Sequence, residues 1–415
     1  MKKLLQWISV ENLCIWCYAI FGLKTALLAF AIPEYSKIYW LFVNAIGVAC
    51  VPLGMAMLFQ QKKVTKKNIC LFCIPLFYFL FRVFYTDGGF KGDGTIPFLI
   101  MGCFMLFHDK LKLKIFNLFF LLFLTQCAFS LAMWCAYLLH IPLGFSELNY
   151  YSENQMGVRY VKWGILAIFK GGTSLRLCGI FNEPGALGTL CAMLFITTFS
   201  NTKIWQKILL LLTGVCTYSL AYYMLIFLFV TCYAIRKNFL NIIWVLLLPL
   251  VFVQIPNMDF GNEQLNRFSQ RFAISKEKGL EGNNRSSELY DYEFSKLVHS
   301  NDIFFGYGMD YNLVTYDNHG TSSYKRYIVQ MGIIGFGLFL ALFIAGGYLQ
   351  AQKNKNALIL LFLFVVSIYQ RPHALINLYG YIVLFGGMLF IQAKSIQSSL
   401  FREKRNEKNR DFNLS

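Results

Sequence analysis

Charged residues are scarce in this 415-residue chain, since they make up 14% of it against 57% for hydrophobic residues. Soluble proteins typically carry about a quarter of their residues as charges. Apolar runs of about 18–22 residues, the length that crosses the hydrocarbon layer of a bilayer, alternate here with short polar stretches. The shortage of charge therefore excludes an ordinary soluble enzyme and indicates a polytopic membrane protein.

Alternating strands of about 10 residues, the pattern of an outer-membrane barrel, are also lacking. The predicted fold class is therefore an all-α polytopic membrane protein with about twelve transmembrane helices. Within 204–235, the segment "TYSLAYY" (217–223) is either a tight turn between two short helices or the middle of one tilted helix. The expected helices are 12–32, 38–60, 68–86, 94–108, 115–141, 179–200, 204–217, 219–235, 239–256, 327–349, 356–370 and 374–393.

Metal-binding patterns are lacking despite twelve cysteines, nearly all of which lie inside apolar runs. The two CxxC spacings, Cys14/Cys17 and Cys70/Cys73, have no histidine or second cysteine pair to complete a site. The polar segments contain no Asp-x-Asp motif or His/Asp cluster suited to a divalent ion. We therefore expect no metal and no cofactor, and interpret the cysteines as small apolar core residues.

Acidic residues are outnumbered, with 21 Asp and Glu against 38 Lys and Arg. The basic excess lies at both termini and in alternate short connections, such as "QKKVTKK" and "AQKNKN". The positive-inside rule then places both termini in the cytoplasm. Because the basic tail 394–415 directly follows a membrane helix, anionic lipid explains it and nucleic acid is not an expected partner.

Two long polar connections, 142–178 and 257–326, fall on the outer side of the membrane. The predicted organisation is nine helices and the first loop within 1–256, the large outer loop 257–326, three helices within 327–393, and the tail 394–415. The large loop has too little apolar content for an independent domain, so we expect it to pack over the membrane domain as a cap. No internal repeat is visible, which weakens a transporter interpretation.

The stretch "RLCGIFNEPGALG" (176–188) carries polar residues that a plain membrane anchor does not need. Asn182 suits the N-cap of a helix running inward from the outer face, and Pro184 is tolerated in its first turn. The positive end of the helix dipole and Arg176 together make an anion site. Glu183 either favours that end and pairs with an arginine, or transfers a proton and steadies a developing positive charge.

The large outer loop supplies further arginines, although it contains eight Lys and Arg against ten Asp and Glu. Arg267 and Arg271 are four residues apart on one expected helix face, and Arg285 precedes a second expected helix. Arg371 lies at an outer helix end. Each arginine is either an ordinary partner of a loop acid or a phosphate ligand, for which its forked, permanently charged guanidinium is suited.

Aromatic residues and one histidine surround the end of this loop. His319 is either a solvated loop residue or a base whose pKa lies near working pH. Tyr307, Tyr311 and Tyr316 either stack on sugar rings or belong to the tyrosine belt of a membrane interface.

Three stretches together resemble the O-antigen polymerase and ligase superfamily of bacterial envelope enzymes. "RLCGIFNEPGALG" matches its Arg-x-x-Gly before an Asn/Glu-Pro helix start, and "NNRSSELYDYEFSKLVHSNDIFFGYG" its arginine, short helix and Gly-x-Gly. His319 before "GIIGFGLFL" resembles its histidine ahead of a Gly-Ile-Ile-Gly helix. One departure is "TYSLAYY", which has no arginine where many members have a Ser-x-Arg-like element.

The resemblance implies a glycosyltransferase C-like fold and metal-independent glycosyl transfer at the periplasmic face of the bacterial inner membrane. The expected partners are undecaprenyl-pyrophosphate-linked glycans as donor and acceptor, membrane lipids, a chain-length regulator and a flippase. Arg176 and Arg285 are expected to hold the pyrophosphate, with Arg267, Arg271 and Arg371 in reserve. His319 is expected to position or deprotonate the acceptor hydroxyl, and Glu183 and Arg285 are the other catalytic candidates.

The first choice of function is a Wzy-type polymerase, which joins lipid-linked repeat units into O-antigen or a similar polysaccharide. A ligase that transfers the glycan to a lipid A core sugar shares the donor and chemistry, so it remains an alternative. A flippase or transporter is an alternative of another class. It predicts charges along a central path, whereas the arginine and histidine residues here concentrate in the outer loops.

Overall fold

The computed structural model describes residues 9–24, 33–61, 63–85, 94–152, 155–171, 174–238, 254–275, 279–280, 286–309, 311 and 323–393. Arg285, His319 and Tyr316 lie outside this part of the chain, as do the basic tail and most of the helix expected at 239–256. Expectations about them stay predictions.

The described apolar helices overlap the ranges predicted from the apolar runs, and five are long and apolar enough to cross a membrane, so the expected count of twelve spans stays a prediction. These are α3 (Pro33–Gln60), α4 (Lys66–Phe84), α6 (Asp109–Leu138), α9 (Leu220–Lys237) and α13 (Lys325–Ala351). Shorter apolar helices are α2 (Val10–Leu23), α5 (Thr95–Leu106), α7 (Pro184–Thr198), α8 (Ile204–Cys216), α14 (Lys355–Ile368) and the segment Leu378–Ala393. That last segment begins with α15 (Leu378–Tyr381) and continues through the π-helical turn η8 (Ile382–Gly386). The protein is a helical membrane protein.

The stretch 204–235 forms two helices, α8 and α9, joined by a turn at residues 217–219. Tyr218 takes a positive φ of 45° in this turn, a conformation uncommon outside glycine. Of the two interpretations of "TYSLAYY", the tight turn is the one that the structure adopts.

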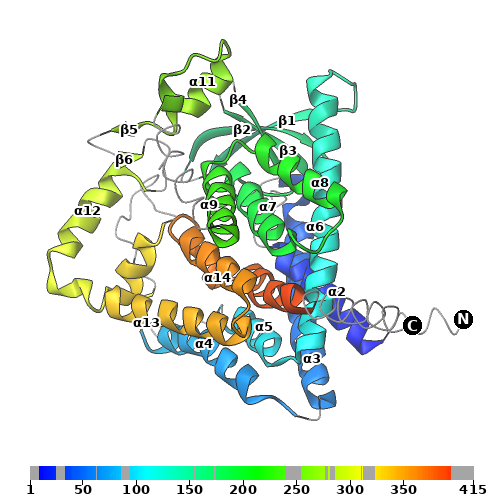
Figure 1. The fold of residues 1–415 in the computed structure, drawn as a ribbon, viewed down its shortest axis with the longest axis vertical. Helices are drawn as coiled ribbons and strands as arrows, with labels where there is room; N and C mark the ends of the chain where they lie inside the picture. The colour runs from blue at the N-terminus through cyan, green and yellow to red at the C-terminus, as the bar shows by residue number, and fades with distance from the viewer. Residues whose placement is uncertain are drawn as a thin grey trace, which may run out of the picture.

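The first outer loop contains a sheet, so the all-α expectation is wrong for residues 142–178. Its four strands pair antiparallel in chain order: β1 (Ser146–Ser152), β2 (Gln155–Trp163), β3 (Leu166–Gly171) and β4 (Ser174–Gly179). Trp163 pairs with Leu166, which leaves a two-residue hairpin loop starting at Gly164 with φ of 57°. Figure 1 shows the sheet across the top of the molecule, beside the end of α6.

The second outer loop contributes short elements along one side of the helical body, at the upper left of Figure 1. They are η5 (Ile255–Asn257), α11 (Glu263–Gln270), β5 (Ile274–Ser275), β6 (Gly279–Leu280), α12 (Glu288–Val298) and η6 (Asn301–Ile303). Phe268 of α11 packs against Tyr218 and Tyr223, with ring centroids 5.6 and 5.1 Å away. This aromatic cluster docks α11 onto the turn between α8 and α9.

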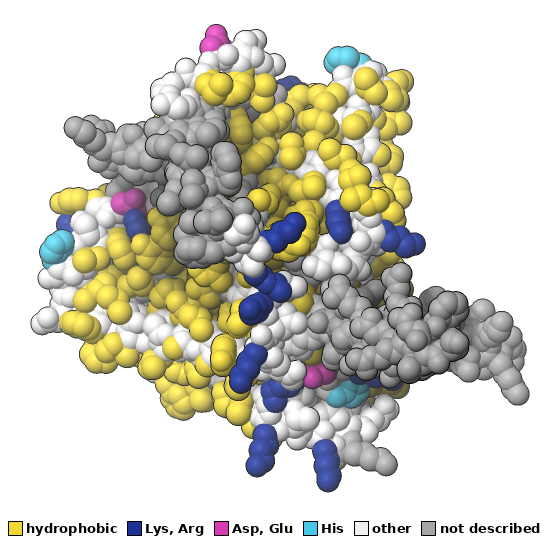
Figure 2. Space-filling view, in the orientation of Figure 1, with side chains coloured by type: hydrophobic (Ala, Val, Ile, Leu, Met, Phe, Trp, Pro, Cys, Tyr) yellow, Lys and Arg dark blue, Asp and Glu magenta, His cyan; other side chains and the backbone are white. Residues whose placement is uncertain are grey.

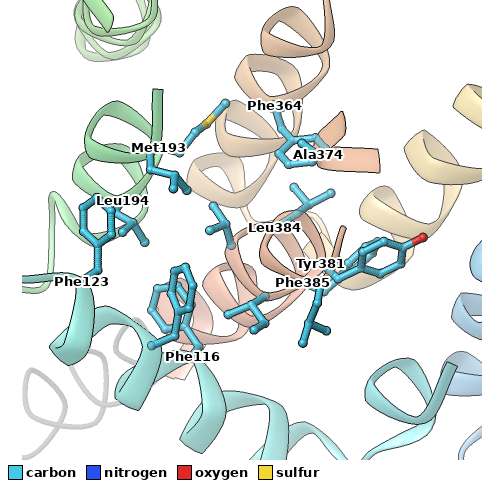
Figure 3. Packing of buried hydrophobic residues seen from close by; sticks show 14 of the residues in the cluster. Phe116, Phe123, Met193, Leu194, Phe364, Ala374, Tyr381, Leu384 and Phe385 are labelled. Carbon is cyan, nitrogen blue, oxygen red and sulfur yellow. The ribbon is translucent and has the colours of Figure 1, made fainter. Parts of the chain in front are cut away.

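The core is apolar and aromatic and joins α6, α7, α14 and the last helix. Figure 3 shows side chains of this cluster from α6 (Phe116, Phe123), α7 (Met193, Leu194) and the last helix (Leu384, Phe385), with Phe123 beside Leu194. The outer surface is also apolar, since Phe59 is 84% exposed. Such large exposed side chains, seen in Figure 2 as a wide hydrophobic area, suit contact with lipid rather than water.

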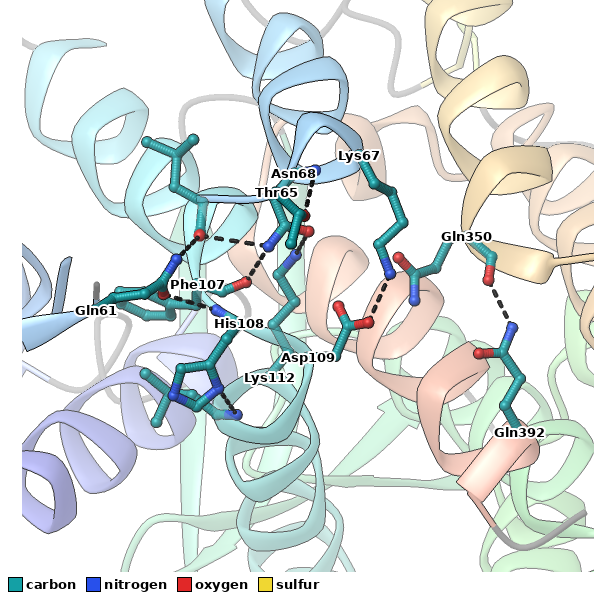
Figure 4. A network of polar contacts seen from close by, with 12 residues as sticks. Gln61, Thr65, Lys67, Asn68, Phe107, His108, Asp109, Lys112, Gln350 and Gln392 are labelled. Carbon is teal, nitrogen blue, oxygen red and sulfur yellow. Dashed lines mark hydrogen bonds and ion pairs between the residues drawn. The ribbon is translucent and has the colours of Figure 1, made fainter. Parts of the chain in front are cut away.

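A buried polar network marks the N-terminal end of α6 (Figure 4). Lys67 pairs with Asp109 at 2.6 Å, and the buried Lys112 ammonium donates to Asn68 Oδ1 at 3.0 Å. Asn68 Nδ2 donates in turn to the Phe107 carbonyl at 2.7 Å. The network ties α4, α5 and α6 together at one end of α6, while the sheet packs near its other end.

Candidate functional site

The N-terminal end of α7 follows the sheet directly and lies near two groups of polar side chains, the pair Arg176 and Arg271 and the pair Glu183 and Arg371. The helix begins at Pro184, and Glu183 takes the N-cap position in extended conformation, one residue later than the expected Asn182. The Asn182 carbonyl instead accepts a 2.7 Å hydrogen bond from the Tyr160 hydroxyl of β2. The sheet thus fixes the entry of the chain into α7.

Gly179 explains the Arg-x-x-Gly spacing before this helix. It has φ of 61°, and an added Cβ would lie 2.0 Å from Gln126 Nε2 and 2.7 Å from Ser130 Oγ of α6. Only glycine fits this close approach of β4 to α6. This close approach sets the position of β4 against α6. Arg176 lies three residues earlier in the same strand, where it pairs with Phe169 of β3.

Two arginines converge on the turn between α8 and α9. Arg176 donates from Nε to the Thr217 carbonyl at 3.0 Å and from Nη2 to the Tyr218 carbonyl at 3.1 Å. Arg271, which follows α11, donates from Nη1 to the same Tyr218 carbonyl at 3.2 Å. Two guanidiniums from the two outer loops therefore share one acceptor.

The electrostatics of this arginine pair favour an anion. Burial lowers the pKa of Arg271 below its ordinary value, but a guanidinium stays charged at neutral pH. Two cations that share one carbonyl repel each other, and a bound anion would relieve that repulsion. Arg176 also lies 5.8 Å from the Phe169 ring centroid, a cation–π contact that fixes its direction.

On another side of α7, Glu183 and Arg371 form an ion pair. Arg371 Nη2 donates to Glu183 Oε2 at 2.8 Å, and the Arg371 side chain is only 15% exposed. Its buried Nε has no hydrogen-bond partner among the residues that the structure describes. Arg371 thus contacts the start of α7, as one interpretation of Glu183 expects.

This ion pair borders a cavity of about 320 Å³ between the start of α7 and residues 370–379. The wall opposite α7 is held in place by the Asn377 Nδ2 donation to the His373 carbonyl at 2.8 Å. His373 Nδ1 also lies 3.3 Å from the Tyr327 hydroxyl of α13. The polar lining side chains are Asn182, Glu183, Thr189, Gln370, Arg371, His373, Asn377 and Tyr379.

The arginine pair and the cavity lie on opposite sides of α7. A Cβ on Gly188 would lie 2.7 Å from Thr217 Oγ1, so this face packs on the turn that the arginines bind. Ala186 lines the cavity, and residues 186 and 188 point about 200° apart around a helix of 3.6 residues per turn. The first two turns of α7 therefore separate the two polar groups.

Two glycine motifs, Gly-x-Gly at 306–308 and the glycine that opens "GIIGFG" at 332, allow two backbone segments to cross closely. The α13 helix is interrupted at Gly332 (φ 67°, ψ 173°), where an added Cβ would lie 2.2 Å from the Phe304 carbonyl oxygen. Gly306 lies equally close, since its Cβ would be 2.6 Å from the Gly332 nitrogen. Tyr307 N donates to the Val329 carbonyl at 2.8 Å. The Gly-x-Gly segment thus crosses the broken helix in direct backbone contact.

Three other expected site residues, Tyr307, Tyr311 and Arg267, belong to the second outer loop. Tyr307 and Tyr311 face each other with ring centroids 4.6 Å apart, near the interruption of α13. Arg267 belongs to α11, one helical turn before Arg271. The structure brings together Arg176 with Arg271, and Glu183 with Arg371.

Sequence reasoning missed the Tyr218 carbonyl and the wall formed by residues 370–379. "TYSLAYY" drew attention only because it lacks an arginine, whereas its backbone receives two arginines from elsewhere. His373 carried one usable signal, its place directly after "RP" at an outer helix end.

Among the described residues, no group of three or more His, Cys, Asp or Glu side chains is arranged to hold a metal ion. Comparisons with protein-family models, with curated proteins and with solved structures find no match to this chain.

Proposed function

We propose that the chain is a glycosyltransferase at the periplasmic face of the bacterial inner membrane, which polymerises undecaprenyl-pyrophosphate-linked oligosaccharide repeat units. The observation that carries the proposal is the convergence of Arg176 and Arg271 on the Tyr218 carbonyl. A diphosphate has enough oxygen acceptors to bind both guanidiniums at once, each through paired hydrogen bonds. The nearby start of α7 adds the positive end of a helix dipole.

In the proposed reaction, a hydroxyl oxygen of the acceptor glycan bonds to the anomeric carbon of the donor. The bond from that carbon to the pyrophosphate oxygen breaks, and its electrons leave with undecaprenyl pyrophosphate. Fixed cations stabilise the charge that grows on this leaving group. The hydroxyl proton passes to a base, for which Glu183 and His319 are the proposed residues.

Other residues keep the roles that the resemblance implies. Arg285 is proposed as a catalytic and phosphate-binding residue, and Arg267 as a further phosphate ligand. Tyr307, Tyr311 and Tyr316 are proposed to stack on sugar rings. The scheme uses arginine for charge stabilisation and includes neither a metal ion nor a cofactor.

The proposed sidedness rests on charge. Lys67, Lys112 and their basic neighbours gather at the N-terminal end of α6, which the positive-inside rule assigns to the cytoplasm together with both termini. The arginine pair belongs to the outer loops, in line with a periplasmic donor. A flippase that delivers repeat units and a chain-length regulator are proposed partners.

The test is chain extension by purified protein in proteoliposomes supplied only with lipid-linked repeat units. We expect a ladder of longer glycans, and Arg271→Ala is expected to slow it about 100-fold, as loss of one donor to a developing charge typically does. Arg236→Ala, at the exposed C-terminal end of α9, is the matched control and should extend normally. Extension only after lipid A core is added would identify a ligase, and transport without extension would contradict the proposal.

A further inference from the structure

We propose that the cavity of about 320 Å³ beside α7 is a sugar-binding subsite, which receives the terminal saccharide of the acceptor glycan. The proposal deepens the proposed function and rests on it. It assigns the two sides of α7 different tasks, with the diphosphate at Arg176 and Arg271 and the acceptor sugar at the cavity.

The lining of the cavity fits a neutral, hydroxyl-rich ligand. Asn182, Gln370 and Asn377 carry amides, which donate and accept hydrogen bonds and so suit sugar hydroxyls. Phe181 and Tyr379 add aromatic surface of the kind that contacts the apolar face of a sugar ring. The volume is at the small end of the roughly 300–1,000 Å³ typical of ligand pockets, as one or two sugar rings require.

Two other occupants fit the cavity less well. A second anion is disfavoured because the Glu183 carboxylate already neutralises Arg371 at 2.8 Å. A lipid chain is disfavoured because it would cover the Asn182 and Gln370 amides with a surface that offers them no hydrogen bond.

Arg371 lines the cavity as the ion-pair partner of Glu183. Its buried Nε lacks a hydrogen-bond partner within the described part of the chain, although Nη2 is bound to Glu183. An unpaired buried donor is unfavourable, but this nitrogen has almost no surface open to the cavity, so it lowers stability and does not itself indicate a ligand.

The wall opposite α7 is already in place for binding. His373 is held by Tyr327 and by Asn377, through its ring and its carbonyl respectively. A Cβ on Gly380 would lie 1.9 Å from the Ala374 carbonyl oxygen, so the chain turns back tightly behind this wall. A preformed wall lowers the cost of ordering on binding.

Because the first two turns of α7 separate the arginine pair from the cavity, donor and acceptor can meet only around the N-terminal end of this helix, where Glu183 is the N-cap. It stands at the start of α7, in the cavity lining, so it is the described carboxylate beside an acceptor hydroxyl bound there. In the proposed step the hydroxyl oxygen bonds to the anomeric carbon and its proton passes to Glu183. The electrons of the broken carbon–oxygen bond leave with the pyrophosphate held by Arg176 and Arg271.

The experiment measures two affinities separately on full-length protein in nanodiscs. One probe is a panel of methyl glycosides of common hexoses and N-acetylhexosamines, and the other is inorganic pyrophosphate. Ala186→Leu places a larger side chain in the cavity and is expected to weaken glycoside binding about tenfold or more, with pyrophosphate binding unchanged. Arg271→Ala is expected to weaken pyrophosphate binding and leave glycoside binding unchanged.

Two further variants guard against misfolding. Ala128→Leu makes the same change at an exposed position of α6 and should leave both affinities unchanged. Asn182→Ala removes an exposed lining amide without adding volume, and we expect it to weaken glycoside binding about fivefold. The thermal unfolding midpoint of each variant shows whether it is folded.

The two proposals fail in different ways. Glycoside binding that is unchanged in both Ala186→Leu and Asn182→Ala overturns the sugar subsite. So does the absence of glycoside binding in a protein that binds pyrophosphate through Arg271, and that result leaves the proposed function standing. Pyrophosphate binding that does not depend on Arg271, with glycoside binding lost in Ala186→Leu, supports the subsite and contradicts the proposed leaving-group clamp.

Discussion

Gly179 and Gly164 have nearly the same backbone conformation in very different surroundings. Their φ angles are 61° and 57°, but an added Cβ would meet α6 at Gly179 and nothing within 4 Å at Gly164. The pair therefore separates the cost of backbone strain from the cost of a steric clash. Since β4 carries Arg176, the clash bears on the position of the arginine pair.

We expect Gly164→Ala to lower the free energy of unfolding by about 1–2 kcal/mol, the strain of a left-handed residue. Gly179→Ala should lower it by about 2–4 kcal/mol, because Gln126 must also turn away and give up its buried 2.8 Å hydrogen bond to Ser130. Denaturant unfolding of the two variants in detergent measures the difference. Equal losses would mean that α6 moves away at no cost.

The Glu183–Arg371 pair is suited to a double-mutant cycle. Glu183→Ala leaves a guanidinium that is 15% exposed without its anion, whereas Arg371→Ala leaves a carboxylate that is 36% exposed. The more buried charge loses more when its partner is removed, so Glu183→Ala should be the more destabilising change. We expect a coupling free energy of about 1–3 kcal/mol from the unfolding of both single variants and the double variant. A coupling near zero would show that the pair adds nothing to stability.

Part of the candidate site is predictable from the types of residue in the sequence. Arg176 and Glu183 stand out in the sequence because a charge at the start of an apolar helix requires an explanation. The meeting of Arg176 with Arg271 at Tyr218 is not predictable, because it depends on the docking of α11 through Phe268 and on an acceptor that is a backbone carbonyl. Every residue has a backbone carbonyl, so the sequence does not show which one accepts these hydrogen bonds.

At the scale of elements, the helices follow from composition and the irregular elements do not. An apolar run of membrane length predicts a helix, and α13 begins at Lys325, two residues before the predicted start at 327. The α6 helix begins at Asp109, six residues before the predicted start at 115, because its first turns are polar. The sheet of residues 146–179 was not expected, because its strands show little alternation of apolar and polar residues, although they have ordinary lengths of 6 to 9 residues. The interruption of α13 at Gly332 depends on backbone contact with Phe304, far away in the sequence.

The crossing at Gly332 gives a prediction for the second outer loop. Gly332→Ala forces a Cβ into the Phe304 carbonyl and into a conformation largely restricted to glycine, at a cost of about 1–3 kcal/mol. The segment 304–309 should then detach more often, and chymotrypsin should cleave it about tenfold faster. Gly337→Ala, in the same helix with nothing within 4 Å of its Cβ, is the control and should not change cleavage. Equal cleavage rates would show that the crossing does not hold the loop.

At the scale of the whole molecule, α6 relates the two ends of the protein. Its 30 residues span about 45 Å at 1.5 Å per residue, which exceeds the hydrocarbon thickness of a bilayer. The polar network with Lys67 and Lys112 lies at its N-terminal end, and the chain leaves its C-terminal end for the sheet. The positive-inside rule therefore predicts opposite sides of the membrane for these two ends.

Single cysteines in a cysteine-free background test this orientation. Lys63→Cys and Ser146→Cys both lie at exposed positions, before α4 and at the start of β1. Since lysine-rich connections are retained in the cytoplasm, a membrane-impermeant maleimide should label Ser146→Cys in intact spheroplasts and Lys63→Cys only after permeabilisation. Normal glycan production by both variants is the control for correct insertion. The reverse labelling pattern would place the arginine pair on the cytoplasmic side, where a periplasmic lipid-linked donor has no access, and the proposed function would fail with it.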